Sequence, residues 1–321
     1  MTGQGGSFSE VALGVDVGGT KVAFGLVDAV GRLAEASRIE NRKAQSADDL
    51  LQQVADEARR LAATAGPAGV AAVGVGICEL IDLDGQVRSS ASIPWSRRQI
   101  LGALSSIGPV VVEADVRAAA LAEARFGAGR GYDSFAFVTV GTGISSCLVL
   151  GGVPYRGAHG TAKLLGSAPV TMTCPHCAMR QRVSLEEIAA GPALVRQFER
   201  RTGVKAGCAE EVFAAAEQGD AVAEGLILEL GETLGSFVAL LVNIVDPQAV
   251  VIGGGLVTAG GVLWDEVVRS ARAHIYADHV RALPIVMAAL GATSGVVGAG
   301  FRGLQEFGSA AAPLGTGWRA L

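Results

Sequence analysis

The stretch Gly14 to Asp28, GVDVGGTKVAFGLVD, places two runs of strand-forming residues on either side of a short turn. The apolar runs Val11–Val17 and Val22–Val27 predict a hairpin whose turn is Gly18–Lys21. Glycines in such a turn let backbone N–H groups approach an anionic oxygen, while the threonine hydroxyl and the lysine charge add to the attraction. The alternative interpretation is an ordinary Gly-Gly hairpin that binds nothing.

A second stretch, FVTVGTGISSCLVLGG from Phe137 to Gly152, repeats the pattern of strand, Gly-Thr turn and strand. Two such turns, one in each half of the chain, favour a pair of phosphate-binding hairpins that face each other across a cleft and clamp a nucleotide. Neither turn has the spacing of a Walker motif or a dinucleotide-binding fingerprint, and no helix is predicted to begin at Lys21.

The rest of the pattern predicts an α/β protein in which the plan of the first half returns in the second. The expected elements are a helix within 46–66 capped by Ser46, strands at 70–80 and 109–115, a helix over Val116–Phe126, helices within Leu185–Glu217 and over Ala221–Ile244, and a buried strand at 247–255 that runs into three glycines. We expect a disordered leader at 1–10, a small N-terminal domain at 11–117 joined by a C-terminal helix at about 294–321, and a large domain at 118–293.

Composition limits the classes of function. Half of the 321 residues are hydrophobic, which is enough for two cores. A net charge of -5 gives no basic surface for nucleic acid. The mean hydropathy is +0.41, but the uncharged run Leu283–Phe301 contains Pro284 and several glycines, so it predicts a buried strand and a Gly-rich helix rather than a membrane span. Without a signal peptide pattern, we expect a cytoplasmic protein.

Two acidic residues stand next to these predicted strands. Asp16 directly precedes the first turn and could hold Mg²⁺ directly or through water. Asp115 ends the strand PVVVEAD at the start of the next helix. It is either the N-cap of that helix or a catalytic base.

Five motifs in this order over nearly the whole chain, DVGGTK, EAD before an Ala-rich helix, GTGI, GAHG and VDPQAVVIGGG, resemble the ROK family of sugar kinases and repressors. The resemblance implies a two-domain, actin-like ATPase fold (ribonuclease H-like) with ATP in the interdomain cleft. It makes Asp115 the base that takes the proton of the attacking sugar hydroxyl. It assigns ATP and its phosphates to Asp16, Gly18, Gly19, Thr20, Lys21, Gly141, Thr142, Gly143, Gly253, Gly254 and Gly255.

The sugar-binding part departs from the family pattern. Ala114 stands where the family has Asn, and the segment after GAHG, Lys163 to Ser167, lacks the family's sugar-contacting Glu and its zinc- and sugar-binding His. Cys78-Glu79 replaces Pro-Gly, and Ser92 replaces Asn, whereas Glu186 matches the last sugar-facing glutamate. Glu79 either forms a salt bridge with a neighbouring Arg or contacts the substrate, so Glu79, Ser92, Asp115 and Glu186 are the candidate substrate-binding residues.

The family's zinc site is degenerate in this chain. Its cysteine positions fall on Cys177, Met179 and Ser184, and structural zinc normally needs four Cys or His ligands. We therefore expect no structural zinc, with Cys174 and Cys177 as weak candidates for a different metal site. The odd total of five cysteines argues against a disulfide framework.

The expected function is an ATP- and Mg²⁺-dependent kinase for a primary (6- or 7-) hydroxyl of a hexose-like substrate. The departures from the family pattern in the sugar-binding part favour an amino sugar of the kanosamine type or a C7-cyclitol as the substrate, as in antibiotic biosynthesis. The alternatives are an ordinary glucokinase or N-acetylmannosamine kinase, or an inactive sugar- or nucleotide-binding protein. A transcriptional regulator is disfavoured because only about ten residues precede the first strand, too few for a helix-turn-helix domain. By resemblance we expect a homodimer.

Overall fold

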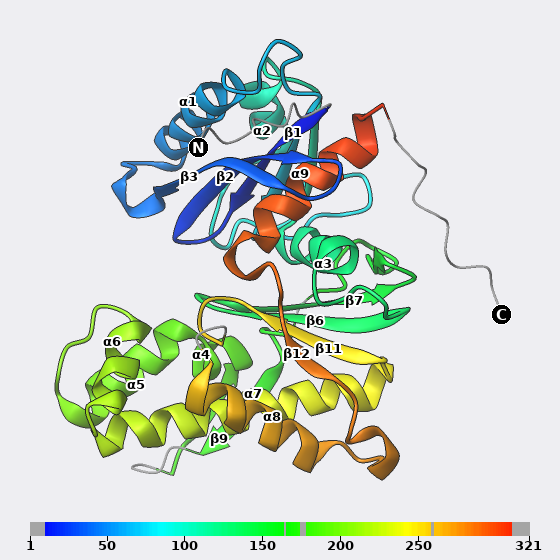
Figure 1. Ribbon diagram of the computed structural model, residues 1–321. Coiled ribbons are helices and arrows are strands. Elements are labelled where there is room, and N and C mark those ends of the chain that lie inside the picture. Colours follow the sequence, from blue (N-terminus) through cyan, green and yellow to red (C-terminus); the bar gives the residue numbers. More distant parts are fainter. Residues whose placement is uncertain (1–9, 164, 174–177, 258–259, 310–321) are drawn as a thin grey trace, which may run out of the picture. The chain divides into compact units, whose positions relative to one another are not determined.

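The computed structural model describes residues 10–163, 165–173, 178–257 and 260–309 (Figure 1). The chain forms two compact units, one of Met1–Arg130, Leu150–Ala162 and Thr293–Leu321, and one of Gly131–Val149 and Lys163–Ala292. The division falls after Arg130, whereas we expected it near residue 117. The reason is that α3 (Asp115–Phe126) packs along α9 (Ser294–Phe307) and so belongs to the first unit.

The first unit is built on a five-stranded sheet in the order β3-β2-β1-β4-β5. The hairpin strands β1 and β2 and the next strand β3 pair antiparallel, while β4 and β5 run parallel to β1. The strands are β1 (Val11–Val17), β2 (Lys21–Asp28), β3 (Leu33–Glu40), β4 (Ala72–Ile77) and β5 (Val110–Ala114). The predicted hairpin is therefore confirmed, whereas β3 was not predicted because its charged, partly exposed residues give little apolar pattern.

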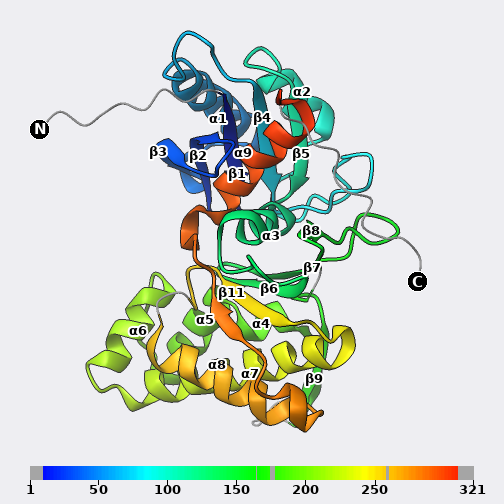
Figure 2. The same cartoon turned by 45° about the vertical axis from the view of Figure 1, so that its right-hand side comes forward.

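The two faces of this sheet are covered by different helices. Successive side chains of a strand point to opposite faces, so alternate residues of β1 contact different helices. Leu13, Val15 and Val17 belong to the same core cluster as the buried residues of α1 (Ala47–Ala62) and α2 (Arg97–Leu104). On the other face, a Cβ at Gly14 or Gly74 would overlap the backbone of α9, so glycine allows this helix to lie directly on β1 and β4 (Figure 2). Asp16 follows Gly14 in this alternation and lies on the α9 face.

The second unit repeats the plan with a sheet in the order β12-β11-β6-β7-β8. The strands of this sheet are β6 (Ser134–Val140), β7 (Ile144–Leu150), β11 (Ala249–Gly253), β12 (Ile285–Met287) and the two-residue β8 (Val153–Pro154), whose residues fall within the segment Leu150–Ala162 of the first unit. The helices are α4 (Leu185–Ala189), α5 (Gly191–Thr202), α6 (Ala209–Glu217), α7 (Ala221–Val245) and α8 (Gly261–His274). An exposed hairpin, β9 (Pro169–Thr173) and β10 (Arg180–Ser184), was not predicted. Single 3-10 turns lie at Asn41–Lys43, Asp278–Val280 and Gly291–Thr293.

Among the described residues, α7 is the one helix long and apolar enough to cross a membrane by length and composition. Half of its most apolar window is buried inside the protein, and it packs along α8. Gly231 and Gly235 permit this close packing, because a Cβ at either position would overlap atoms of α8. The helix thus serves as a core helix of the second unit.

The other helix boundaries follow the sequence closely. Ser46 caps α1 by accepting the N–H of Asp49 at 3.1 Å, as predicted. The run Leu283–Phe301 forms β12 and most of α9, which confirms a strand followed by a helix, although only Ile285 of the strand is buried. The C-terminal helix ends at Phe307, and residues 310–321 and the leader at 1–9 lie outside the described residues.

Candidate active site

The Gly-Gly-Thr turn between β1 and β2 is open to solvent and braced from one side. Gly18 donates its N–H to the Lys21 carbonyl at 3.0 Å, and Gly19, Thr20 and Lys21 are exposed. Asn41, which follows β3, brackets the turn: its Nδ2 donates to the Gly18 carbonyl at 2.8 Å and its N–H to the Thr20 carbonyl at 3.0 Å. The turn is thus a fixed, accessible loop of the kind that binds phosphate.

Asp16, at the end of β1, is the most perturbed acid of this unit. Its pKa is raised from 3.8 to about 7, chiefly by burial and then by the nearby Asp115 carboxylate, while Lys21 acts to lower it. A Cβ at Gly295, in the first turn of α9, would lie 2.3 Å from Asp16 Oδ2, so a glycine there makes room for the carboxyl group. Such perturbed acids are a mark of functional sites.

Asp115 is the first residue of α3 and partly exposed. The N-cap is the preceding Ala114, which has no side-chain cap, and Asp115 Oδ1 accepts the N–H of Val116 at 2.7 Å. The N-cap interpretation of Asp115 is therefore wrong by one residue. Gly76 on β4 lies between the two acids, since a Cβ there would be 3.5 Å from the Asp115 Cα and 3.6 Å from Asp16 Oδ1.

Glu79 is 1% exposed and anchors the loop that follows β4. Its carboxylate accepts the N–H groups of Ser92 at 2.6 Å, Ile93 at 2.8 Å and Ala91 at 3.1 Å, and also the hydroxyl of Ser89. Burial acts to raise the pKa of Glu79, but these hydrogen bonds outweigh it and hold the pKa below its usual value. The contacts join Glu79 to residues 89–93.

That loop reaches the first glycine turn. Ser92 is exposed, and a Cβ at Gly19 would lie 3.8 Å from its hydroxyl oxygen. The first unit therefore brings Asp16, Lys21, Asp115 and Ser92 to one region, with Glu79 buried beneath the loop.

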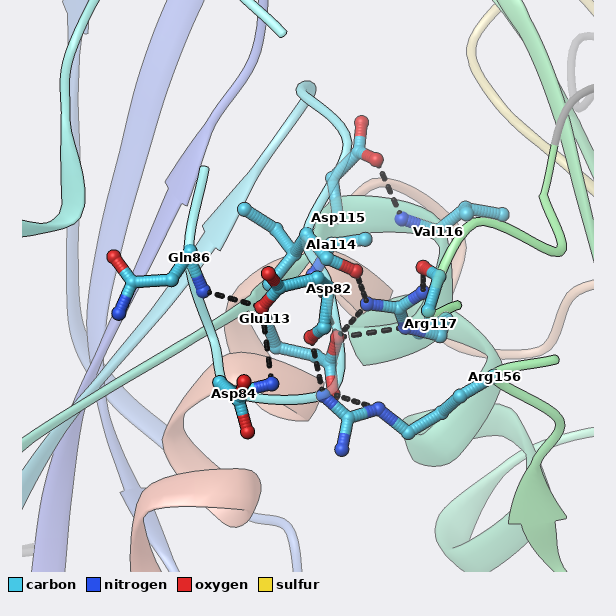
Figure 3. A network of polar contacts seen from close by, with 11 residues as sticks. Asp82, Asp84, Gln86, Glu113, Ala114, Asp115, Val116, Arg117 and Arg156 are labelled. Atoms are coloured by element: carbon cyan, nitrogen blue, oxygen red, sulfur yellow. Dashed lines mark hydrogen bonds and ion pairs between the residues drawn. The ribbon is translucent and has the colours of Figure 1, made fainter. Parts of the chain in front are cut away.

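A buried ion pair lies beside Asp115 (Figure 3). Arg117, 1% exposed, donates from Nε to Glu113 Oε1 at 2.7 Å, and Glu113 is 7% exposed. Arg156 donates to the Asp82 carbonyl at 2.9 Å and lies 3.9 Å from the second oxygen of Glu113. Sequence reasoning missed Arg117 and Glu113, although their spacing of four across the start of a predicted helix is a signal for such a pair.

In the second unit, the Gly-Thr-Gly turn between β6 and β7 is held by Glu186 and Gly191. Glu186, in α4, accepts the N–H of Ile144 at 2.8 Å, and a Cβ at Gly143 would lie 2.5 Å from the same carboxylate. Gly191, at the start of α5, donates its N–H to the Gly141 carbonyl at 2.9 Å. Thr142 at the tip is exposed. The turn is thus fixed at its base and open at its tip.

The three glycines after β11 lie next to this turn. A Cβ at Gly141 would be 3.9 Å from the N atom of Gly255. Gly254 has a φ of +90° and its Cβ would lie 2.3 Å from the Val140 carbonyl oxygen, so only glycine fits there. Gly253 is buried against Phe137, and Gly255 is exposed. The second unit therefore places its two predicted nucleotide-binding segments side by side.

Of the proposed metal ligands, Cys174 and Cys177 lie outside the described residues, as does Leu164. Within the described ranges, no three His, Cys, Asp or Glu residues are grouped closely enough to hold a metal ion. In the segment after GAHG that departs from the family pattern, Lys163 and Gly166 are buried, whereas Ser167 is exposed.

Comparison with known proteins shows the family to which the sequence is similar. Residues 12–302 match the model of the ROK family. A glucokinase of Streptomyces coelicolor is 30% identical over 310 residues, which cover 90% of this chain and 96% of that protein. A kanosamine kinase of Amycolatopsis mediterranei is 33% identical over 295 residues, which cover 89% of this chain and 94% of that protein.

A solved structure gives the same result for the fold. A ROK family glucokinase from Streptomyces griseus, in complex with glucose and AMPPNP, has a TM-score of 0.77 and 29% identity, and the match covers 92% of this chain and 99% of that one. The predicted α/β fold of the actin-like ATPases is thereby confirmed.

Proposed function

The chain belongs to the ROK family, and on this premise we propose that it is a sugar kinase that transfers a phosphoryl group from ATP to a hydroxyl of its substrate. The observation that carries the proposal is the meeting of Asp16, Asp115 and the Gly-Gly-Thr-Lys turn in the first unit. A phosphate-binding loop beside two acids is what phosphoryl transfer to a hydroxyl requires.

Asp115 is the proposed general base. Its carboxylate accepts the proton of the acceptor hydroxyl while the hydroxyl oxygen forms a bond to the γ-phosphorus of ATP and ADP leaves. A base of this kind supplies about 10²–10⁴ in rate. Its position at the start of α3, partly exposed beside the glycine turn, supports this role.

The chemistry of the neighbouring acids fits Mg²⁺, since carboxylate oxygens are its preferred protein ligands. Asp16, directly or through water, would hold the ion, and Asp115 lies near enough to raise the Asp16 pKa. A bound cation would offset this repulsion and would supply positive charge to stabilise the transferring phosphoryl group.

For the nucleotide we propose, in the first unit, backbone N–H groups of the glycine turn with Thr20 and Lys21, and, in the second unit, those of the Gly-Thr-Gly turn with Thr142. The open tips of both turns support this assignment. In the second unit, the triglycine segment Gly253–Gly255 is proposed for the adenosine, because it lies beside the Gly-Thr-Gly turn and the absence of side chains permits close approach.

For the acceptor we propose a hexose-like compound with a primary hydroxyl, an amino sugar of the kanosamine type or a C7-cyclitol. The changes at positions 79, 92 and 114 and the similarity to a kanosamine kinase support this choice, and the similarity to glucokinases supports glucose as the second candidate. Ser92 is proposed to contact the acceptor. Glu186 is proposed as a substrate-binding residue, and its Oε2 accepts the N–H of Ile144. We propose a cytoplasmic homodimer on the family resemblance.

The test is ADP formation with ATP, Mg²⁺ and a panel of glucose, N-acetylmannosamine, glucosamine, kanosamine and a valienol-type cyclitol. Transfer to at least one member, with the product phosphate placed on its primary carbon by NMR, is the expected result. Absence of turnover with every member, together with no ATP binding by calorimetry, would contradict the proposal and favour a non-catalytic binding protein.

A further inference from the structure

Arg117 is the most completely buried cation among the described residues. Charged side chains are rarely buried to this extent unless they are paired. Its guanidinium group donates to Glu113 Oε1 from Nε at 2.7 Å, to the Ile81 carbonyl from Nη2 at 2.9 Å, and to the Gly160 carbonyl from Nη1. One side chain thus joins three segments that are far apart in the sequence.

These three segments meet at Arg117, in the first turn of the helix that begins with the proposed base. Glu113 and Arg117 lie two residues before and two residues after Asp115 (Figure 3). Ile81 forms a β-bridge with Val87, at the base of the turn that precedes the Glu79-anchored loop with Ser92. Gly160 closes the GAHG motif. Arg156 adds a second link between the same parts through the Asp82 carbonyl.

Stability alone does not account for such a pair. The desolvation cost of a buried ion pair is comparable to its Coulombic gain, so an apolar replacement is often as stable. A guanidinium group, however, donates in fixed directions from a rigid plane and therefore sets the relative position of the groups it binds. The pair is suited to fixing geometry.

We propose that Arg117 is a positioning residue for the phosphoryl acceptor. It holds segments 79–89 and 157–160 against α3, so that an acceptor bound by these segments presents its hydroxyl to Asp115. This inference rests on the proposed kinase function. It names a residue that acts through the backbone around the base and does not itself touch the reacting atoms.

The test compares Arg117→Lys, which keeps the charge and loses the planar fork, with Arg60→Lys, a matched change at the exposed Arg60–Glu57 pair on α1 of the same unit. Misplacement of reacting groups by about 1 Å costs on the order of 100-fold in rate. We therefore expect kcat/KM for the acceptor to fall about 10- to 100-fold in Arg117→Lys, with KM for ATP unchanged within about twofold. Arg60→Lys should change neither.

Amide exchange separates positioning from general loss of stability and does not depend on turnover. In Arg117→Lys, peptides covering 79–89 and 150–162 should exchange faster than in the wild type, while peptides of β1 and β2 should not. If Arg117→Lys fails to fold, the double variant Glu113→Gln/Arg117→Met, which removes both buried charges, takes its place with the same expectations.

Equal losses for ATP and acceptor, or unchanged exchange in both segments, would overturn the inference. Failure of the proposed function is distinct, because it shows in the wild type as absence of transfer to any acceptor. In that case faster exchange would still support the anchoring of both segments by Arg117, and unchanged exchange would refute it.

Discussion

Asp16 and Asp115 lie on either side of Gly76, and their carboxyl groups repel each other. A Cβ at Gly76 would make ordinary van der Waals contact with both residues. Together with burial, this repulsion raises the pKa of Asp16 to about 7, although Lys21 acts in the opposite direction. The first unit thus keeps an unfavourable pair of acids where phosphate and metal are proposed to bind, which is typical of functional sites.

Asp16→Asn should stabilise the protein at alkaline pH. The ordinary pKa of 3.8 applies to the unfolded chain, whereas the folded pKa is about 7. Between these values the folded protein binds a proton that the unfolded chain has lost, so stability falls as pH rises from about 4 through about 7. At pH 8 the variant should therefore be more stable by on the order of 1–4 kcal/mol, and at pH 4 no different. Urea unfolding in EDTA without nucleotide measures this.

The control for this experiment is Asp265→Asn, at an exposed position on α8. It should leave the free energy of unfolding unchanged at both pH values. A variant at position 16 that is less stable than the wild type at pH 8 would show that ionised Asp16 stabilises the apo fold, contrary to the expectation.

Asp115→Asn should lower kcat about 100- to 10,000-fold and leave the fold intact. The amide cannot accept the proton of the acceptor hydroxyl, but it can still accept the Val116 N–H as Oδ1 does now. Steady-state kinetics with the best acceptor of the panel, together with the unfolding midpoint, test both parts. Wild-type turnover in this variant would remove Asp115 from the mechanism.

Glu79→Gln should destabilise the protein by about 1–3 kcal/mol at pH 7, because an amide replaces one accepting oxygen by a donor that faces backbone N–H groups. The folded pKa of Glu79 lies below its usual value, so its contribution is present above about 4.5 and is lost as pH falls through the folded pKa. The stability difference between wild type and variant should therefore shrink in acid.

The control for position 79 is Glu229→Gln, which removes an exposed carboxylate paired with Arg201. A surface pair of this kind contributes about 0–1 kcal/mol. If the two variants lost equal stability, or if the effect at position 79 grew on acidification, the loop-anchoring role of Glu79 would be refuted.

Gly254→Ala should be destabilising by about 1–3 kcal/mol or more, because the residue has a φ of +90° and the new Cβ would overlap the Val140 carbonyl. Gly255→Ala meets nothing within 4 Å and should change stability by less than about 0.5 kcal/mol. Thermal unfolding compares them. Equal midpoints would mean that the segment after β11 adapts freely, and that its glycines are kept for another reason.

Much of the fold followed from local pattern. The apolar runs that became β1, β2, β4, β5 and β11 are continuous and end at glycine or polar residues, and Ser46 marks the start of α1 through its own side chain. Among the elements that were not predicted, which also include α2, α8 and β8, β3 is partly exposed and the β9–β10 hairpin is largely exposed. Their strand conformation comes from pairing with a neighbouring strand, and this leaves little apolar signal in the sequence.

The sequence by itself determined that two Gly-Thr turns each join a pair of strands, that Asp115 directly follows a buried strand, and that the motifs are those of the ROK family. Only the tertiary structure decided the roles of Glu79, Asn41 and Arg117 in holding loops, because each bonds to residues distant in sequence. It also decided the raised pKa of Asp16, which depends on burial under α9 and on Asp115. Local pattern is written in neighbouring residues, whereas desolvation and long-range hydrogen bonds exist only once the chain has packed.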